Sequence, residues 1–348
     1  MASRPDAPFI LRFTQVIVFV DYCAVGAMRT VLPYYAKRLG ASGAKVGGLE
    51  TSYGVGQVAG ALLLGWLSDA RGRKAVLLLS FIGAAIGYGI ASFAVASGSV
   101  LMLLASRLPV GLAKQTVTAT RAIISDVTEP AARSEALARL FAGCSLGYAV
   151  GPYLGGLLAD RSGDASPAPA LTCAFIFIVL LPTVAILLPE TRDAAAVAAP
   201  AAPPSSGTRS KATATATGGA GDGAGGGEGG KETTLLLAGS TLAEGALVMF
   251  SSTSLPLLGQ QLGWTATQLG LYNSTWGVAS GCLSLTLWPY LLASGRLPDI
   301  AALRLGVVSM GGACGALALY SHSAIALWAV LPLGTIAVGM IRTIRENS

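Results

Sequence analysis

Three cations lie at regular spacing inside one apolar stretch of the chain. Arg107, Lys114 and Arg121 are each seven residues apart, and on a helix this spacing places them on one face, two turns per step. A charge at the middle of a bilayer costs on the order of 3 kcal/mol, so such side chains face a cavity or a partner. Gln115 and Thr118 add polar groups there. We therefore predict that this face lines a cavity, although Arg121 alone could instead reach to the aqueous interface.

Acidic side chains occur at similar depth. Asp21, Glu50 and Glu244 each fall in or near an apolar stretch of membrane-spanning length. A carboxylate away from water binds a proton more readily than one in water, so these three are candidates for proton coupling, with Asp21 the first choice. The alternative for Asp21 is a static ion pair with Arg107 or Lys114. Arg29, two turns further along the same stretch, is a third partner for it and a further candidate for lining the cavity.

The sequence offers few residues for catalysis or metal binding. His322 is the only histidine, and the five cysteines form no pair with the spacing of metal ligands. We find no nucleophile with a base beside it and no phosphate-binding loop of the Walker type. We therefore predict no metal, no cofactor and no enzymatic activity.

Long membrane helices are the elements that the composition predicts for positioning these groups. The chain has 348 residues, of which 53% are hydrophobic and only 11% charged, whereas about 25% is usual for soluble domains. So little charge could not cover the surface of a soluble protein of this length. The net charge of +6 then reflects basic cytoplasmic loops rather than a nucleic-acid partner. The sequence predicts an all-α protein in a lipid bilayer.

Ten stretches are long and apolar enough to span a bilayer, which needs about 20 residues per helix. They are 10–35, 46–67, 75–97, 100–124, 136–159, 168–188, 234–258, 266–292, 301–320 and 323–341. With the N-terminus in the cytoplasm, 15 of the 23 Lys and Arg residues fall in inner segments and 4 in outer loops. Basic residues favour the cytoplasmic side, so we predict a multi-pass protein with its N-terminus inside. The outer cluster Lys37, Arg38 and Lys45 is the exception.

The chain divides into two membrane halves. Residues 190–232 are dominated by Ala, Pro, Ser, Thr and Gly, a composition that cannot bury enough apolar surface to offset its ordering entropy. We predict a bundle of six helices over 1–189, a disordered cytoplasmic linker over 190–232 and a bundle of four helices over 233–348.

An internal repeat supports this division. When the chain is shifted by 223 residues, Leu32-Pro33 falls on Leu255-Pro256, Gly54-Val55 falls on Gly277-Val278, and Asp21 meets Glu244. A parallel repeat of half a membrane domain is typical of a two-bundle transporter. Residue 348 corresponds to residue 125, the end of the fourth span, so we expect a second bundle that lacks two helices. The alternative is a natural ten-helix protein.

Glycine-rich and charged motifs recur at characteristic places. The loop after the second span reads Gly65-Trp66-Leu67-Ser68-Asp69-Ala70-Arg71-Gly72-Arg73-Lys74. The fifth span carries Gly147, Gly151, Pro152, Gly155 and Gly156, and the fourth carries Arg107 and Gly111. Gly143, Gly147, Gly151 and Gly155 lie every four residues on one helix face, where small residues let two backbones approach closely.

Together these motifs resemble three signatures of the major facilitator superfamily. The likeness covers about 12–190, and it is greatest to drug–proton antiporters of the tetracycline-efflux type and to the eukaryotic orphan proteins called major facilitator domain-containing proteins. The resemblance implies that the loop motif closes the cytoplasmic side, with Arg73 pairing an acid and Asp126 completing a charge relay. Ala70 departs from the pattern, which often has Arg there.

The function that this resemblance implies is secondary active transport. We expect one chain, acting as a monomer, to move a small organic solute across a membrane by proton-coupled alternating access. The cationic face could attract an anion, or the acids could neutralise it and leave room for an apolar or cationic compound. An uncoupled facilitator is one alternative, and a non-transporting receptor, scaffold or inactive truncated product is another.

Overall fold

The described residues are helical throughout, apart from the turns between helices. The computed structural model describes residues 7–163, 166–191, 259, 262–285, 308, 309, 311, 312 and 315. The helices are α1 (Ala7–Arg38), α2 (Gly43–Arg71), α3 (Arg73–Ser97), α4 (Val100–Ala105), α5 (Arg107–Ala113), α6 (Thr116–Val127), α7 (Pro130–Ser162), α8 (Ala168–Leu187) and α12 (Ala266–Leu285). The chain divides into two compact units, and the residues discussed below lie in the one formed by 1–197 and 251–278.

Most of the predicted spans in this part of the chain coincide with single helices. The stretches 10–35, 46–67, 75–97, 136–159 and 168–188 lie on α1, α2, α3, α7 and α8, and 266–292 begins on α12. Four helical segments of the described residues are long and apolar enough to cross a membrane, namely α1, α3, α8 and the stretch Val100–Val127. The stretches 234–258 and 323–341 lie outside the described residues, as does most of 301–320.

The fourth span differs from the single continuous helix that we predicted, because it is interrupted twice. Pro109 has no N–H and its ring crowds the carbonyl four residues earlier, and the hydroxyl of Ser106 donates to the carbonyl oxygen of Leu103 (2.6 Å). These features separate α4 from α5. The second break is at Lys114 and Gln115, where Lys114 has φ −73° and ψ 70°. The backbone therefore leaves the helix at the residue that carries the central cation.

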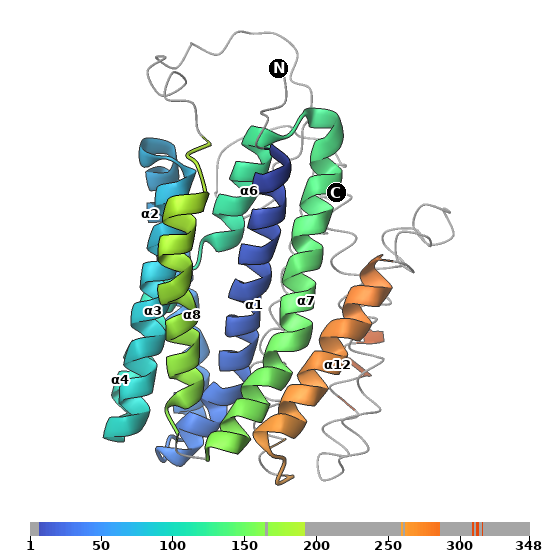
Figure 1. Ribbon diagram of the computed structural model, residues 1–348. Coiled ribbons are helices and arrows are strands. Elements are labelled where there is room, and N and C mark those ends of the chain that lie inside the picture. Colours follow the sequence, from blue (N-terminus) through green and yellow to red (C-terminus); the bar gives the residue numbers. More distant parts are fainter. Residues whose placement is uncertain are drawn as a thin grey trace, which may run out of the picture. The chain divides into compact units, whose positions relative to one another are not determined.

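The helices pack in pairs around an apolar core. α1 lies along α7, α2 along α5 and α3 along α8. Figure 1 shows α1 and α7 side by side, with α12 next to α7. In the core, the rings of Phe81 and Tyr88 lie 5.6 and 5.8 Å from that of Phe177, which joins α3 to α8.

Glycines make the contact between α1 and α7 close. Gly143, Gly147, Gly151 and Gly155 all face the backbone of α1. A methyl group added at Gly147 would lie 2.6 Å from the carbonyl oxygen of Phe19, and one added at Gly151 would overlap the backbone of Cys23. On the α1 side of this contact, Gly26 lies against the ring of Pro152. The two helices therefore approach at a distance that side chains would prevent.

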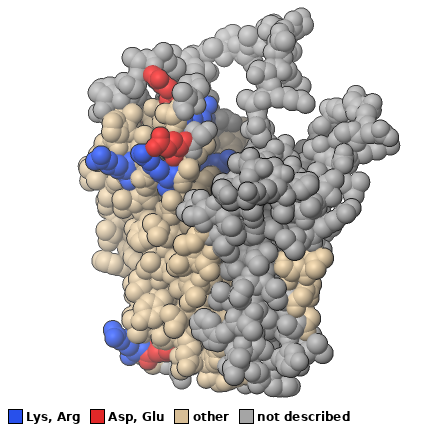
Figure 2. Space-filling model, turned by 90° about the vertical axis from the view of Figure 1, so that its right-hand side faces the viewer, with Lys and Arg blue, Asp and Glu red and all other residues tan. Residues whose placement is uncertain are grey.

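Charged side chains gather toward the ends of the helices. Figure 2 shows blue and red residues near the top and bottom of one face, with tan residues between them. Large apolar side chains are exposed along the helices, including Val55, Val58, Leu62 and Trp66 of α2. This distribution suits a protein surrounded by lipid, in which polar groups meet the two aqueous interfaces.

Candidate functional site

A buried ion pair joins α1 to the break in the fourth span. The ammonium group of Lys114 donates to the carboxylate of Asp21. The side chain of Asp21 is 1% exposed and that of Lys114 is 10% exposed. The same ammonium lies 5.2 Å from the ring of Tyr22, which in turn meets the ring of Tyr148 edge to face at 4.9 Å. Asp21, the first candidate for proton binding, is therefore in contact with Lys114, the middle one of the three cations.

The other two cations of the predicted face lie against rings from two further helices. The guanidinium of Arg107 is 4.9 Å from the ring centre of Tyr53 on α2, and that of Arg121 is 5.6 Å from the ring of Phe141 on α7. Although the helix is broken, all three cations point to neighbouring helices. Nearby, the hydroxyl of Thr118 donates to the side-chain oxygen of Gln115 (3.0 Å).

Of the other three predicted residues, two belong to the described part of the chain. Glu50 is half-buried on α2 and makes no hydrogen bond or ion pair with any described residue. Arg29 is half-buried on α1, two turns beyond Asp21. Glu244 lies outside the described residues. The repeat-related pair of acids therefore stays a prediction.

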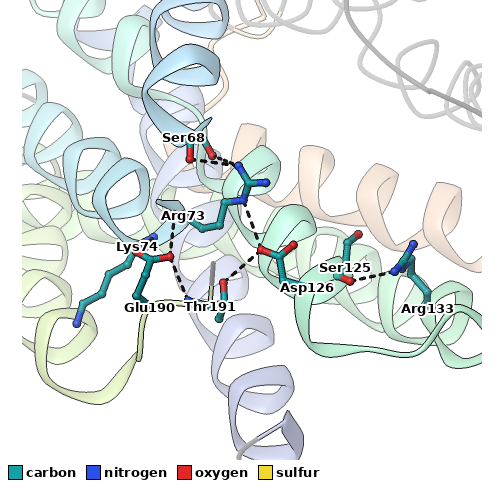
Figure 3. A network of polar contacts seen from close by, with 8 residues as sticks. All are labelled: Ser68, Arg73, Lys74, Ser125, Asp126, Arg133, Glu190 and Thr191. Carbon is teal, nitrogen blue, oxygen red and sulfur yellow. Dashed lines mark hydrogen bonds and ion pairs between the residues drawn. The ribbon is translucent and has the colours of Figure 1, made fainter. Parts of the chain in front are cut away.

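A second polar network lies at the junction of α2 and α3, which the charge distribution predicts to be cytoplasmic (Figure 3). Arg73 reaches the carboxylate of Asp126 (Nε–Oδ2 3.4 Å) and donates to the hydroxyl of Ser68 (2.8 Å). The hydroxyl of Thr191 also donates to Asp126 (3.5 Å), and Arg133 donates to the carbonyl oxygen of Ser125 (3.0 Å). The network ties the ends of α2, α3 and α6 to the chain that follows α8.

Glu190 is the member of this network that the sequence analysis missed. Its carboxylate accepts hydrogen bonds from the backbone N–H groups of Arg73 (3.0 Å) and Lys74 (3.3 Å), so it caps the first turn of α3. A negative charge at a helix N-terminus is favourable. Gly72 leaves room for this carboxylate and has φ +95°, which favours glycine. Because Glu190 and Thr191 make these contacts, the predicted linker begins within the network.

The remaining residues of the loop motif have less defined surroundings. Lys74 donates to the carbonyl oxygen of Ala185 at the end of α8 (2.7 Å). Arg71 is exposed, and Gly65 has open space around it. The side chain of Asp69 lies outside the described residues.

At the opposite ends of the helices, α1 and α7 hold the first turn of α12. The carboxylate of Asp160 accepts from the backbone N–H groups of Ala266 (3.1 Å) and Thr267 (2.9 Å). The hydroxyl of Tyr34 donates to the carbonyl oxygens of Trp264 (3.0 Å) and Thr265 (3.1 Å). Gly156 also lies against the backbone of Ala266. The contact was not predicted, because its two sides lie 106 to 231 residues apart in the sequence.

The local sequence explains why α12 begins there. The hydroxyl of Thr265 accepts from the N–H of Gln268 (3.3 Å), and the side chain of Gln268 accepts from the N–H of Thr265 (3.0 Å). This is the reciprocal capping box of a Thr-x-x-Gln sequence. Burial acts to raise the pKa of Asp160, but hydrogen bonds from Thr267, Thr265 and Ala266 outweigh it and hold the pKa below its ordinary value of 3.8.

Comparison with known proteins identifies the family. Residues 16–344 match the family model of the Major Facilitator Superfamily. The chain belongs to the major facilitator superfamily. Members of this superfamily are transporters, and the all-helical structure with apolar helices agrees with an integral, multi-pass membrane protein.

Individual relatives agree with the resemblance read from the motifs. Solute carrier family 22 member 18 of Rattus norvegicus is 34% identical over 170 residues, which are 48% of this chain and 41% of the relative. The class B tetracycline resistance protein of Escherichia coli is 33% identical over 186 residues, which are 52% of this chain and 45% of the relative. The chain thus matches less than half the length of these two relatives.

A solved structure supports the fold over almost the whole chain. The human organic anion transporter MFSD10 (TETRAN) covers 99% of this chain and 85% of its own, with a TM-score of 0.61 and 21% identity. The predicted membership of the major facilitator superfamily and the likeness to tetracycline-type proteins are therefore confirmed.

The described residues offer no candidate metal centre. Among them, no group of three or more His, Cys, Asp or Glu side chains is close enough to hold a metal ion.

Proposed function

We propose that this chain carries out secondary transport of a small organic solute by alternating access and that proton binding at Asp21 drives it. The observation that carries the proposal is the buried pair of Asp21 and Lys114 in a major facilitator fold. A carboxylate held by a single ammonium can exchange that partner for a proton. The exchange raises the charge inside the bundle by one unit and releases the ammonium of Lys114 from its carboxylate.

The choice of solute is guided by the relatives. Their names include tetracycline resistance proteins and an organic anion transporter, and the site presents cations beside aromatic rings. Both an aromatic antibiotic and an organic anion suit such surroundings. The proposed partners are therefore a small organic molecule and protons.

The proposal is tested with the full chain reconstituted in liposomes under an imposed pH gradient, using tetracycline and benzoate as probes. We expect the gradient to accelerate movement of at least one probe in the wild type. Asp21→Asn should abolish that acceleration, because the amide cannot bind the proton. Arg38→Gln, at the exposed end of α1, is the matched control and should behave as the wild type.

Each outcome points to one reading. Movement of a probe that ignores the gradient would identify an uncoupled facilitator. No movement of either probe would reject transport in favour of a receptor or scaffold. Gradient-driven movement that persists undiminished in Asp21→Asn would remove Asp21 from the coupling mechanism.

A further inference from the structure

Arg107 is a buried cation whose Nε has no hydrogen-bond partner among the described residues. Only 7% of the residue is exposed. Its guanidinium lies 4.9 Å from the ring centre of Tyr53, and it forms no ion pair with any described residue. A guanidinium carries five N–H donors, and burying a charge without a partner is costly. The Tyr53 ring covers one face of the guanidinium but offers no acceptor in the plane of Nε.

The neighbouring cation shows the contrast. Lys114 lies seven residues further along and is also largely buried, but its ammonium is neutralised by Asp21. Asp21 is therefore engaged, and Glu50 makes no ion pair with any described residue. Among the described residues, Lys114 therefore has an ion-pair partner and Arg107 has none, and Glu50 acts on the Tyr53 ring only at longer range.

Aromatic side chains lie near both buried cations. Tyr53 of α2 and Tyr88 of α3 lie within electrostatic range of both Arg107 and Asp21. Tyr22 and Tyr148 form an edge-to-face pair beside Lys114. A planar guanidinium binds a carboxylate through two parallel hydrogen bonds, and aromatic rings favour an apolar or aromatic body attached to it.

We propose that Arg107 is the anchor of an organic-anion site, which takes a carboxylate on an aromatic body, and that proton binding at Asp21 strengthens anion binding. The second part rests on the proposed function, because it uses Asp21 as the proton site. When Asp21 is charged it neutralises Lys114, and only Arg107 attracts the anion. When Asp21 takes up a proton it releases Lys114, and two cations then attract the anion.

The other groups around Asp21 do not compensate the positive charge that is gained when Asp21 takes up a proton. The titratable and charged side chains that act on it come from α1, α2, α3, α7 and the break after α5. Among the described residues they include Tyr22, Tyr53, Tyr88, Cys144 and Lys114. Lys114 is the only ion among them at neutral pH, since tyrosines and thiols are neutral there. Linkage is reciprocal, so an anion that binds better to the protonated form also promotes proton uptake.

The test measures binding by calorimetry to the full chain in lipid nanodiscs, with benzoate and its neutral isostere benzamide as probes. We expect benzoate to bind more tightly than benzamide, and to bind more tightly in acid by up to about tenfold per pH unit for one linked proton. Arg107→Gln should weaken benzoate binding roughly 10- to 100-fold, the value of charge-assisted hydrogen bonds. Arg107→Lys should retain part of the affinity, and Arg38→Gln all of it.

Asp21→Asn provides the second arm and does not depend on the folding of the Arg107 variants. It imitates the protonated carboxyl, so benzoate should bind to it at neutral pH as tightly as the wild type does in acid, with no further dependence on pH. Equal affinity for benzoate and benzamide, or benzoate affinity unchanged in a folded Arg107→Gln variant, would overturn the anion site. Weaker benzoate binding in Asp21→Asn would overturn the linkage.

Failure of the site and failure of transport give different results. If the chain moves tetracycline under a pH gradient while benzoate does not outbind benzamide, the anion site is rejected and transport stands. If benzoate binds through Arg107 with the expected pH dependence but neither probe crosses the membrane, transport is rejected and the site stands.

Discussion

Asp21 and Lys114 depend on one another more than most charged residues do. Both side chains are at least nine-tenths buried, so water cannot compensate for the loss of either. Removing one partner of a buried pair typically costs about 3–5 kcal/mol, whereas replacing both is often close to neutral. The pair therefore contributes to function chiefly by what happens when one of its members changes charge.

We predict a strong coupling between these residues in a double-mutant cycle. Lys114→Gln should lower the free energy of unfolding by about 3 kcal/mol, because it leaves the carboxylate of Asp21 buried and unpaired. Adding Asp21→Asn should recover most of that loss. Thermal unfolding in one detergent at neutral pH measures both effects. Additive losses in the double variant would show that the two side chains do not form a pair.

For individual residues, the sequence predicted which charged side chains lie within the bundle, but it did not predict most of the side chains that they contact. Arg107, Lys114 and Asp21 stand out because charges are rare in apolar stretches. Asp21 with Lys114 was one of several open pairings, since a one-dimensional spacing does not say which helices are neighbours. Glu190 was missed because it follows the last apolar span, where an acidic residue looks like ordinary linker.

Among the elements, α1 and α7 are held by backbone contact. The glycines of α7 face α1 over three turns, and Gly151 lies against the backbone of Cys23. Backbone atoms cannot rotate aside as a side chain can, so any added side chain must separate the helices. The four-residue spacing of the glycines predicted one shared face, and only the structure shows that α1 covers it.

Gly151→Ala is expected to destabilise the protein by about 1–3 kcal/mol, as overpacking does elsewhere. Gly89→Ala on α3 is the matched control, since Gly89 has open space and a helical backbone. That control should be neutral or stabilising by up to about 1 kcal/mol, because Ala favours a helix. Thermal unfolding midpoints compare the two variants, and equal midpoints would contradict close packing at Gly151.

The contact of Asp160 with the first turn of α12 is expected to be insensitive to pH in the physiological range. Hydrogen bonds hold the pKa of Asp160 below 3.8. A lowered pKa means that the contact is fully present above the ordinary pKa and is lost as the pH falls through the lowered value. Between about pH 5 and 8 the carboxylate therefore stays charged and bound.

Hydrogen exchange at the amides of Ala266 and Thr267 measures this contact. After correction for intrinsic rates, protection in the wild type should not change over that pH range, and Asp160→Asn should lower it. Ser162→Ala, at the exposed end of α7, is the control and should leave it unchanged. Protection that falls steadily between neutral and mildly acidic pH would show that the carboxylate is not stabilised by these amides.

The breaks within the fourth span show where sequence reasoning about elements fails. A regular seven-residue spacing assumes an unbroken helix, but Pro109 and the turn at Lys114 interrupt it. The cations still face neighbouring helices because each is placed by its own local turn. The seven-residue spacing therefore predicted the three cations that face other helices, although it assumed a continuous helix that the backbone does not form.

For the molecule as a whole, orientation in the membrane is the testable consequence of the charge distribution. Lys45 lies in the first turn of α2 and Ala132 in the first turn of α7, and both are exposed. The bias of Lys and Arg predicts that Lys45 is outside and Ala132 is in the cytoplasm. Lys45→Cys should react with a membrane-impermeant maleimide on intact cells, and Ala132→Cys only after permeabilisation.

The unsubstituted chain measures the background from its own five cysteines. The reverse pattern of labelling would invert the topology, and the network around Arg73 would then lie outside.

The motifs and the repeat predicted the family, and the composition predicted membrane helices, of which four are found among the described residues. Contacts such as that of Tyr34 with α12 could not be predicted, because they depend on how distant helices meet.

The ion pair of Asp21 and Lys114 also bears on how the chain enters the membrane during its synthesis. The stretch Val100–Val127 is the least apolar of the four spanning segments, and each basic residue at mid-helix adds about 2.5–3.5 kcal/mol to the cost of insertion. The stretch Val100–Val127 emerges from the ribosome after α1, and the carboxylate of Asp21 on α1 can neutralise Lys114. The fourth span is therefore expected to leave the translocon efficiently only while α1 is still beside it, so that Asp21→Leu would trap the nascent chain before any question of transport arises.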